Sequence, residues 1–451
     1  MLHRKIEEDL KNWKETKLGL FLDGPRQVGK TYILNYFAKQ NFKNVIYINF
    51  YEDKMAKLAL DIEYENVQSF MLRLKAYLNV DDIPTDTAII LDEIQELKKL
   101  DIVTLSKFLV SSTPYRWILS GSLLGVTLNN IASWPMGYVT SLTLYPLDFE
   151  EFLWAKGISK STIELIKDCF YSRKTPDEFI HKKIMICFKE YLLTGGLPKA
   201  VETFVETNDL GKANEVFESL NNYYLTDITK YAPKENRLDI MSIYELIPEE
   251  INKESKRFNV KDIENYKKKD YKTSFNWLYA AGIAIPVFNV KEAETPLRLN
   301  TERTLLKLFS FDTGLLTYKL MDPSLKIKIL NEDKDINFGA IYENAVAVLL
   351  HANGFDKLYY YNNKKYGEVD FLIERGGEVI PLEIKSGKAF KTHSGIDNII
   401  KIRNYNIKEG YVFSNDREIK KEGSLVYFPI YMIAFLKKKL GVHDYDSLLL
   451  K

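Results

Sequence analysis

The first 150 residues alternate short apolar runs with segments of helical period. Five of these runs are typical of strands, because each is rich in branched or aromatic apolar residues and is bounded by polar or turn residues. Strands separated by helices favour a parallel sheet with helices on both faces. The pattern therefore predicts an α/β domain in this part of the chain. The expected strands are Leu18–Leu22, Asn44–Phe50, Thr87–Leu91, Arg116–Leu119 and Thr140–Leu144.

From about residue 149 the pattern changes to longer segments of helical period, which include DFEEFLWAKG, Glu178–Leu193 and Ala213–Tyr231. Around residues 257–290 a short pair of helices precedes the apolar run IAIPVFNV, and from about residue 338 a helix leads into alternating, strand-like segments. We therefore expect a helical and then a winged-helix-like middle part, followed by a second α/β domain. The predicted domains are residues 1–155, 156–232, 233–335 and 336–451.

Composition restricts the class of protein. Of the 451 residues, 46% are hydrophobic and 28% are charged, which is typical of a globular protein and argues against long disordered tracts. The formal net charge is only +1. Any contact with nucleic acid must therefore come from a local basic patch and not from the chain as a whole.

The N-terminal segment, MLHRKIEEDLKNWK, is charged and amphipathic, unlike a signal peptide with an apolar core. No stretch reaches the roughly 18 consecutive apolar residues that predict a membrane-spanning helix. The two cysteines, Cys169 and Cys187, lie far apart in helical segments, which favours buried thiols in a reducing compartment. These features predict a cytoplasmic protein without a membrane partner.

The strongest chemical signal, GPRQVGKT, directly follows the apolar run GLFL and fits the phosphate-binding pattern GxxxxGK[ST]. Its glycines let the backbone curl so that N–H groups point at phosphate oxygens, and the following helix offers its positive N-terminal end. Lys30 would reach the β- and γ-phosphates, and the Thr31 hydroxyl would bind Mg²⁺. The predicted nucleotide-binding residues are Gly24, Pro25, Arg26, Gln27, Val28, Gly29, Lys30 and Thr31.

A second signal is the acidic pair that ends the apolar run Ala88–Leu91. Asp92 would hold Mg²⁺ directly or through water, and Glu93 would act as the general base for the attacking water. An acidic pair alone is better explained as a solvated loop, but the preceding phosphate-binding loop reverses that preference. A carboxylate beside this aspartate is typical of the branch that uses adenine nucleotides, and the chain has no guanine-reading NKxD motif. We therefore expect ATP with Mg²⁺.

A third strand end carries small polar residues, Ser120, Gly121 and Ser122. A hydroxyl in this place could contact the γ-phosphate and report its hydrolysis. Ser120 is the preferred sensor, because it lies at the end of the strand. The alternative is that these residues form a simple turn.

Taken together, eight segments resemble the bacterial and archaeal AAA-like ATPases that carry a conserved C-terminal domain of unknown function. The resemblance extends from residue 24 to residue 387 and implies an ATPase that often works between subunits, so oligomeric assembly is left open. In many relatives a Gly-Arg pair precedes the LYPL segment, and its arginine can stabilise the transition state. Here Tyr138 follows Gly137, and Arg116 and Arg173 are only guesses for that role. The segments are GPRQVGKT, ILDEIQ, ILSGS, LYPLDFEEFL, TGGLPKAV, FSFDTGLL, GAIYENAV and EVDFLI with LEIKSG.

A second constellation lies near the C-terminal end. Residues two apart in a strand point to one face, so Glu383 and Lys385 project together. Asp370 lies on the preceding strand of an apparent hairpin, and Glu343 lies on a helical stretch. The set resembles the PD-(D/E)xK nuclease fold, which implies Asp370, Glu383 and Lys385 as catalytic residues. Two carboxylates could bind a divalent metal against a phosphate, with Glu343 as an auxiliary ligand.

The alternative for this constellation carries nearly equal weight. A D…ExK pattern is short, and a half-exposed strand of alternating charged and apolar residues produces it by chance. Nuclease-like domains can also persist as binding platforms, because a fold does not imply a function. Metal chemistry and its loss are therefore about equally supported.

Between the two constellations, residues 253–272 contain eight basic and four acidic side chains, a local charge of +4. The following helix and apolar run would suit a winged-helix module whose lysines contact DNA phosphates. Lys267, Lys268 and Lys269 are the candidate contacts. The alternative is a solvated basic face on a domain that merely packs.

Three functions follow from these patterns. The first is an ATP-driven enzyme that acts on DNA, and the second is a nucleotide-dependent switch whose C-terminal parts bind a protein or DNA without chemistry. The third is an interaction protein in which ATP only stabilises the fold. The intact set of Lys30, Thr31, Asp92 and Glu93 argues against the third. ATP turnover and DNA cleavage are the measurements that separate the three.

Overall fold

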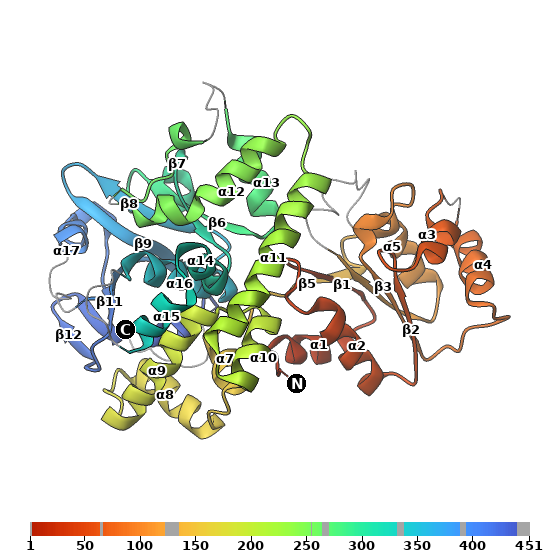
Figure 1. Cartoon of the computed structure of the whole chain (residues 1–451), viewed down its shortest axis with the longest axis horizontal. Helices are drawn as coiled ribbons and strands as arrows, with labels where there is room; N and C mark the ends of the chain where they lie inside the picture. Colours follow the sequence, from red (N-terminus) through yellow and green to blue (C-terminus); the bar gives the residue numbers. More distant parts are fainter. Residues whose placement is uncertain are drawn as a thin grey trace. The chain divides into compact units, whose positions relative to one another are not determined.

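The structure is a computed structural model that describes residues 2–63, 66–121, 135–253, 255–263, 270–331, 338–387 and 394–439. The chain folds into two compact units (Figure 1). Residues 3–145 make up most of the first unit, and residues 146–279 and 283–451 make up the second. The three domains expected after residue 155 therefore fall almost entirely within one unit.

The first unit is built on a five-stranded parallel sheet in the order β2-β3-β4-β1-β5. Each predicted strand is present to within about one residue at either end. Because β1 lies inside the sheet beside β4, the loop that follows it opens at the same edge as the ends of β3 and β4. The bounds are β1 Gly19–Asp23, β2 Asn44–Asn49, β3 Thr87–Asp92, β4 Arg116–Ser120 and β5 Val139–Thr143.

Polar side chains cap the N-terminal ends of α3, α4 and α5 in the first unit. The side chain of Asn66 accepts the N–H of Ser69 at the start of α4, and Asp101 accepts the N–H of Thr104 at the start of α5. The core includes Trp117 packed edge-to-face on Phe70, with 6.1 Å between the ring centroids. The bounds are α1 Ile6–Lys14, α2 Lys30–Asn41, α3 Lys54–Leu60, α4 Val67–Leu78, the 3₁₀ turn η1 Ile94–Glu96 and α5 Ile102–Ser112.

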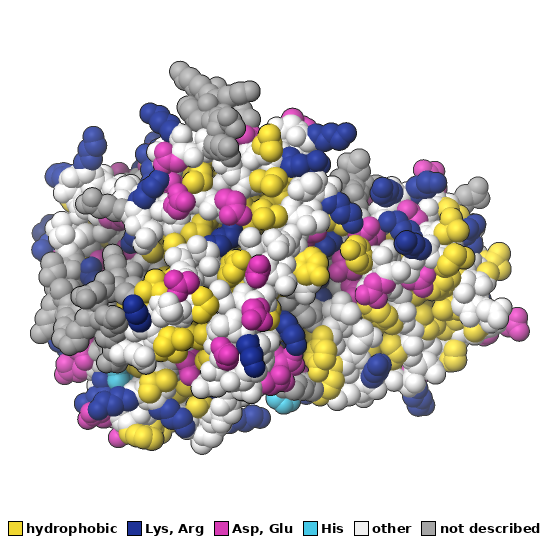
Figure 2. All heavy atoms as spheres, viewed as in Figure 1, with side chains coloured by type: hydrophobic (Ala, Val, Ile, Leu, Met, Phe, Trp, Pro, Cys, Tyr) yellow, Lys and Arg dark blue, Asp and Glu magenta, His cyan; other side chains and the backbone are white. Residues whose placement is uncertain are grey.

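Basic and acidic side chains are interspersed on the face shown in Figure 2, as the low net charge of the chain leads one to expect. Apolar side chains also reach the surface of the first unit over α3 and α4. They include Met55, Leu58 and Leu72, which are each more than half exposed. Scattered exposed apolar residues of this kind are normal on a protein surface.

The second unit is built on a mixed eight-stranded sheet in the order β12-β13-β11-β10-β9-β8-β6-β7. Strands β9 and β10 form the antiparallel hairpin that the sequence predicts, with its turn at Gly376 and Gly377. The strand bounds are β6 Ala284–Val290, β7 Thr301–Ser310, β8 Leu358–Asn363, β9 Gly367–Arg375, β10 Glu378–Lys385, β11 Gly410–Ser414, β12 Lys420–Glu422 and β13 Leu425–Pro429.

The β6–β7 hairpin departs from the predicted domain boundary. It comes from the segment expected to form a separate winged-helix-like domain, yet β6 pairs in parallel with β8, with Val287 opposite Leu358. The backbone hydrogen bonds of β6 thus join it to the C-terminal strands. The predicted boundary between residues 335 and 336 therefore divides the chain within one hydrogen-bonded sheet.

The helices expected after residue 149 are present as α7, α9 and α11. Within the described residues, no helix is both long and apolar enough to cross a membrane. The bounds are α7 Phe149–Ala155, α8 Lys160–Ser172, α9 Glu178–Thr194, α10 Pro198–Thr207, α11 Leu210–Tyr231, α12 Arg237–Asn252, η2 Val260–Asp262, α13 Lys272–Ala280, η3 Leu297–Asn300, α14 Thr313–Leu320, α15 Pro323–Leu330, α16 Gly339–Ala352, α17 Ser394–Ile400, η4 Arg403–Tyr405 and η5 Ile430–Phe435.

A buried carboxylate joins the helices of the second unit. Asp312 is 1% exposed and accepts the N–H of Gly196 at 2.7 Å and that of Leu315 at 2.8 Å, which ties the end of α9 to the start of α14. Close by, the Lys326 ammonium donates to the carbonyl of Leu193 at 3.1 Å. Burial raises the pKa of Asp312 to about 6 and lowers that of Lys326 to about 7.

We expect Asp312→Asn to flatten the pH dependence of stability. Because burial raises the pKa of this carboxyl above its unfolded value, the folded chain binds the proton more tightly from about pH 4 to 6. The stabilisation is complete below this range and is lost as the pH rises through it. The free energy of unfolding should fall by on the order of 1 kcal/mol per pH unit there, as measured by urea unfolding. The exposed Asp81→Asn is the control, and an equally steep slope in Asp312→Asn would contradict the prediction.

Candidate functional site

The loop between β1 and α2 has the curled backbone that phosphate binding requires. Gly24, Gln27 and Gly29 have φ values of 139°, 64° and 93°. A Cβ atom on Gly24 would lie 2.2 Å from the carbonyl oxygen of Leu144, so only glycine fits there. Helix α2 begins at Lys30, and its N-terminal end therefore lies at the loop. The predicted phosphate-binding loop has the geometry of an anion site.

Lys30 lies inside this loop and is 6% exposed. Its ammonium donates to the carbonyl oxygens of Gly24 at 2.9 Å and Pro25 at 2.8 Å. Burial lowers the pKa of Lys30, and the carboxylates of Glu93 and Asp92 oppose that shift. Phosphate oxygens could replace the two neutral carbonyls and would compensate the buried charge better.

The acidic residue predicted to hold Mg²⁺ lies against the loop. Asp92 is fully buried at the end of β3, and its Oδ2 atom accepts the Thr31 hydroxyl at 2.6 Å. The same oxygen accepts the Tyr47 hydroxyl at 2.9 Å, and Tyr47 accepts the amide of Asn49 at 3.2 Å. The structure thus brings Thr31 and Asp92 together as expected. Tyr47 is not identifiable as part of the site from sequence, because nothing in the sequence says that β2 is the neighbour of β3.

Glu93 follows at the turn after β3. It adopts a left-handed conformation with φ 55°, and its Oε2 atom accepts the side-chain amide of Gln95. The Arg26 guanidinium from the phosphate-binding loop lies 3.9 Å from the same oxygen. Gln95 and Arg26 thus act on the candidate general base, and the role of Gln95 was missed from sequence.

The candidate sensor and the candidate DNA contacts are the next predicted residues to be located. Ser120 lies at the end of β4 as expected, but it is fully buried, and its hydroxyl has no hydrogen-bond partner among the described residues. Ser122 and the candidate DNA contacts Lys267, Lys268 and Lys269 lie outside the described residues.

Arg116 and Arg173, the two candidates for a transition-state arginine, each contact other residues of their own unit. The Arg116 guanidinium lies 4.7 Å from the centroid of the Trp13 ring and donates to the carbonyl of Thr16. Arg173, in the second unit, pairs with Glu409 at 2.6 Å. Both arginines therefore have structural partners, and the identity of a transition-state arginine stays open.

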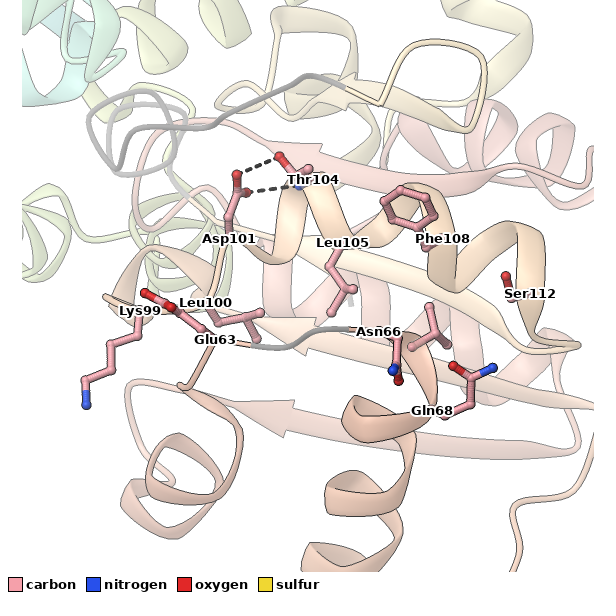
Figure 3. A pocket seen from close by; sticks show the side chains of 11 residues that line it. Glu63, Asn66, Gln68, Lys99, Leu100, Asp101, Thr104, Leu105, Phe108 and Ser112 are labelled. Atoms are coloured by element: carbon pink, nitrogen blue, oxygen red, sulfur yellow. Dashed lines mark hydrogen bonds between the residues drawn. The ribbon is translucent and has the colours of Figure 1, made fainter.

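The first unit also has a cavity of about 640 Å³ (Figure 3). It lies at the beginnings of α4 and α5, where the capping residues Asn66 and Asp101 are part of its lining, together with Lys99 and Phe108. Asp101 uses its carboxylate on the N–H and hydroxyl of Thr104, as the dashed lines show. No predicted nucleotide-binding residue lines the cavity, so it is distinct from the phosphate-binding loop.

The second unit brings the four residues of the C-terminal constellation into one region. Asp370 on β9 accepts the N–H of Ile384 on β10 at 2.8 Å, and Lys385 pairs with Glu383 at 2.7 Å. Burial, and then the Asp370 charge, raise the pKa of Glu383 to about 8 and that of Glu343 on α16 to about 7. The three carboxylates therefore lie close enough to repel one another.

Two lysines missed from sequence change the chemistry of this region. Lys256 pairs with Oε1 of Glu343, and the Lys307 ammonium lies 3.8 Å from Oε2 of the same residue. Lys307 also pairs with Glu368 at 2.6 Å and is 1% exposed. Burial disfavours its charge, but Glu343 and Glu368 outweigh that effect and raise its pKa.

These ion pairs depart from the predicted metal site at Glu343, Asp370 and Glu383. Among the described ranges, no group of three or more histidine, cysteine, aspartate or glutamate side chains is arranged to hold a metal ion. The physical reason is that lysine ammoniums already occupy oxygens of Glu343 and Glu383. As arranged here, the carboxylates do not fit a metal without displacement of these lysines.

Three family models match separate parts of the chain. Residues 17–153 match an AAA domain, residues 186–326 match a domain of unknown function (DUF8612), and residues 338–433 match another domain of unknown function (DUF4143). The first match supports the AAA-like domain that the sequence predicts at the start of the chain. The nuclease-like and winged-helix-like interpretations stay predictions.

Solved structures resemble the chain only distantly. A Walker-type ATPase of Pyrococcus abyssi is 15% identical over 71% of this chain and 96% of its own, with a TM-score of 0.42. The RuvB Holliday junction branch migration motor of Thermotoga maritima is 13% identical over 66% and 91%, with a TM-score of 0.29. Drosophila ORC bound to DNA is 13% identical over 71% and 92%, with a TM-score of 0.28. No curated protein matches the chain significantly. Because these structural similarities are so distant, the function is argued from the geometry of the site alone.

Proposed function

We propose that the first unit binds ATP with Mg²⁺ and hydrolyses it. The observation that carries the proposal is the 2.6 Å contact between Thr31 and Asp92, which places a hydroxyl and a carboxylate oxygen side by side at the phosphate-binding loop. Oxygen ligands of this kind suit Mg²⁺ shared with nucleotide phosphates. Glu93 directly follows Asp92, at the same edge of the sheet.

The residues of the site then have separate roles. The N–H groups of residues 26–29 and the Lys30 ammonium bind the β- and γ-phosphates and balance the charge on the leaving oxygen. Thr31 and Asp92 would hold Mg²⁺, which would supply charge neutralisation when it is bound. Water attacks the γ-phosphorus while Glu93 accepts its proton, and the bond to the bridging oxygen breaks.

The first test compares two variants. Lys30→Ala should weaken ATP binding by about a hundredfold or more, because phosphate charge inside the loop loses its partner. Glu93→Gln should still bind ATP while its turnover falls by roughly two to four orders of magnitude, because an amide cannot accept the proton. Calorimetry and phosphate release measure the two effects. The matched control, Lys39→Ala, changes an exposed lysine on the same helix and should behave as wild type.

An ATP affinity that stays unchanged in Lys30→Ala would contradict the proposal. Normal steady-state turnover by Glu93→Gln would instead remove Glu93 as the base.

Tyr47 provides a second test, directed at the magnesium ligand. Tyr47→Phe removes the hydroxyl that donates to Asp92 and should weaken Mg²⁺ in the presence of ATP by about tenfold, because such outer hydrogen bonds orient a ligating carboxylate. The control is Tyr32→Phe, which alters a tyrosine that is 55% exposed. A Mg²⁺ titration of ATP turnover gives the apparent affinities. Equal values in the two variants would show that Tyr47 does not support the metal site.

We further propose that the second unit acts as a partner-binding output without metal-dependent cleavage, in line with a nucleotide-dependent switch. What supports this is the pairing of Glu343 with Lys256 and Lys307, and of Glu383 with Lys385. In this proposal the eight-stranded sheet, with β6 and β7 included, keeps a PD-(D/E)xK-like fold, and the segment before β6 supplies a winged-helix-like DNA contact. The partner is then DNA, or a protein that the second unit binds.

A metal titration tests the proposal for the second unit. Without nucleotide, Mn²⁺ should not raise the melting temperature of the wild type, because the internal lysines compete for the carboxylates. Lys307→Met should gain a stabilisation by Mn²⁺ that disappears again in Lys307→Met/Asp370→Asn. Lys401→Met, at an exposed position, is the matched control. Metal-dependent DNA cleavage by the wild type that Asp370→Asn abolishes would favour the nuclease alternative instead.

A further inference from the structure

Gln95 contacts the candidate general base of the first unit from two residues further along the chain. Its side-chain amide nitrogen donates to Oε2 of Glu93. Gln95 is only 5% exposed, so its amide has little access to water that could replace this bond. A buried donor to a carboxylate is among the stronger side-chain hydrogen bonds.

The backbone holds this contact in place. Glu93 adopts the left-handed conformation, with φ 55° and ψ 44°, and the 3₁₀ turn η1 follows at once. The N–H of Glu96 closes the turn on the carbonyl of Glu93 at 3.0 Å. A non-glycine residue in this conformation carries strain that the surroundings must offset. Here the sharp turn brings the Gln95 side chain back to the Glu93 carboxylate.

The end of strand β4 supports Gln95 from the other side. A Cβ atom on Gly121 would lie 2.6 Å from the Gln95 side-chain oxygen and 3.1 Å from a side-chain carbon of Ile94. Ile94 and Gln95 of η1 therefore pack directly over Gly121, which follows the candidate sensor Ser120. The absence of a side chain at Gly121 leaves the space that Gln95 fills.

We propose that Gln95 is the positioning residue of the ATPase site. The Gln95 amide holds Oε2 of Glu93, so that Oε1 can accept the proton of the attacking water. This rests on the proposed hydrolysis of ATP. Arg26 approaches the same Oε2 atom at 3.9 Å, so both donors leave Oε1 as the oxygen assigned to water. Since a small misplacement of a catalytic group costs a large part of the rate, the effect appears in turnover and not in binding.

The central test is Gln95→Met, which keeps the length of the side chain and removes the donor. Turnover should fall by about tenfold to a hundredfold, as for the loss of a hydrogen bond to a charged group. The affinity for ATP, measured by calorimetry in the presence of Mg²⁺, should stay within about twofold of the wild type. Gln68→Met, the same change at an exposed position of the first unit, should leave both quantities unchanged.

Two further measurements separate positioning from a merely structural role. In the Glu93→Gln background, Gln95→Met should cause no additional loss of single-turnover rate, because the two residues act as one unit. Gly121→Ala should reproduce the turnover defect of Gln95→Met, since its methyl group displaces the Gln95 side chain. A parallel loss of ATP affinity, or an additive loss in the double variant, would overturn the proposal.

Failure of this proposal is distinguishable from failure of the proposed function. If Gln95→Met turns over ATP at the wild-type rate while Glu93→Gln does not, Gln95 has no positioning role and the ATPase assignment stands. If Glu93→Gln itself hydrolyses ATP normally, the assignment of the base is wrong, and the role of Gln95 is overturned with it.

Discussion

The hydrogen bond from Thr31 to Asp92 is the contact on which the site of the first unit depends. It joins the helix after the phosphate-binding loop to the end of β3, although β4 lies between β1 and β3 in the sheet. A parallel sheet presents the carboxyl ends of all its strands at one edge, where ligands of such folds bind. The loop, the acidic pair and the end of β4 therefore meet in space despite their separation along the chain.

The two units compensate buried charge in different ways, and this difference bears on their chemistry. Lys30 is held by two backbone carbonyls, neutral partners that the oxygens of a phosphate can replace. In the second unit, by contrast, buried Glu343 and Glu383 already have lysine partners. A buried ion pair is costly to break, because the remaining charge is left without compensation. The first site is thus open to an anionic ligand, whereas the second must give up internal partners before a metal can enter.

The proposed catalytic groups of the first unit are held by neighbours to which no chemical step is assigned. Tyr47 orients Asp92 from the adjacent strand, and Gln95 contacts Glu93 from the following turn. Such outer contacts restrict the orientation of a ligand or a base before substrate arrives, which is how a site gains precision. If the second unit acts as a switch, it needs only a change in the nucleotide bound to this site. It does not need a second reaction.

Local signals in the sequence were sufficient for the strands and the phosphate-binding loop of the first unit. Its five strands are apolar runs with clear boundaries, and a motif of glycine, lysine and threonine is specific because phosphate binding needs that backbone and those donors. The β9–β10 hairpin was also predictable, since its two glycines lie between alternating strands. Each of these features depends on residues close together in the chain.

Only the tertiary structure decided which strands are neighbours and which charges meet. Tyr47 faces Asp92 because β2 pairs with β3, and Lys307 reaches Glu343 because β6 and β7 join the C-terminal sheet. The same pairing places a predicted domain boundary inside one sheet. Strand order and ion pairing depend on contacts between residues far apart in the chain, and hydrophobic periodicity carries no information about them.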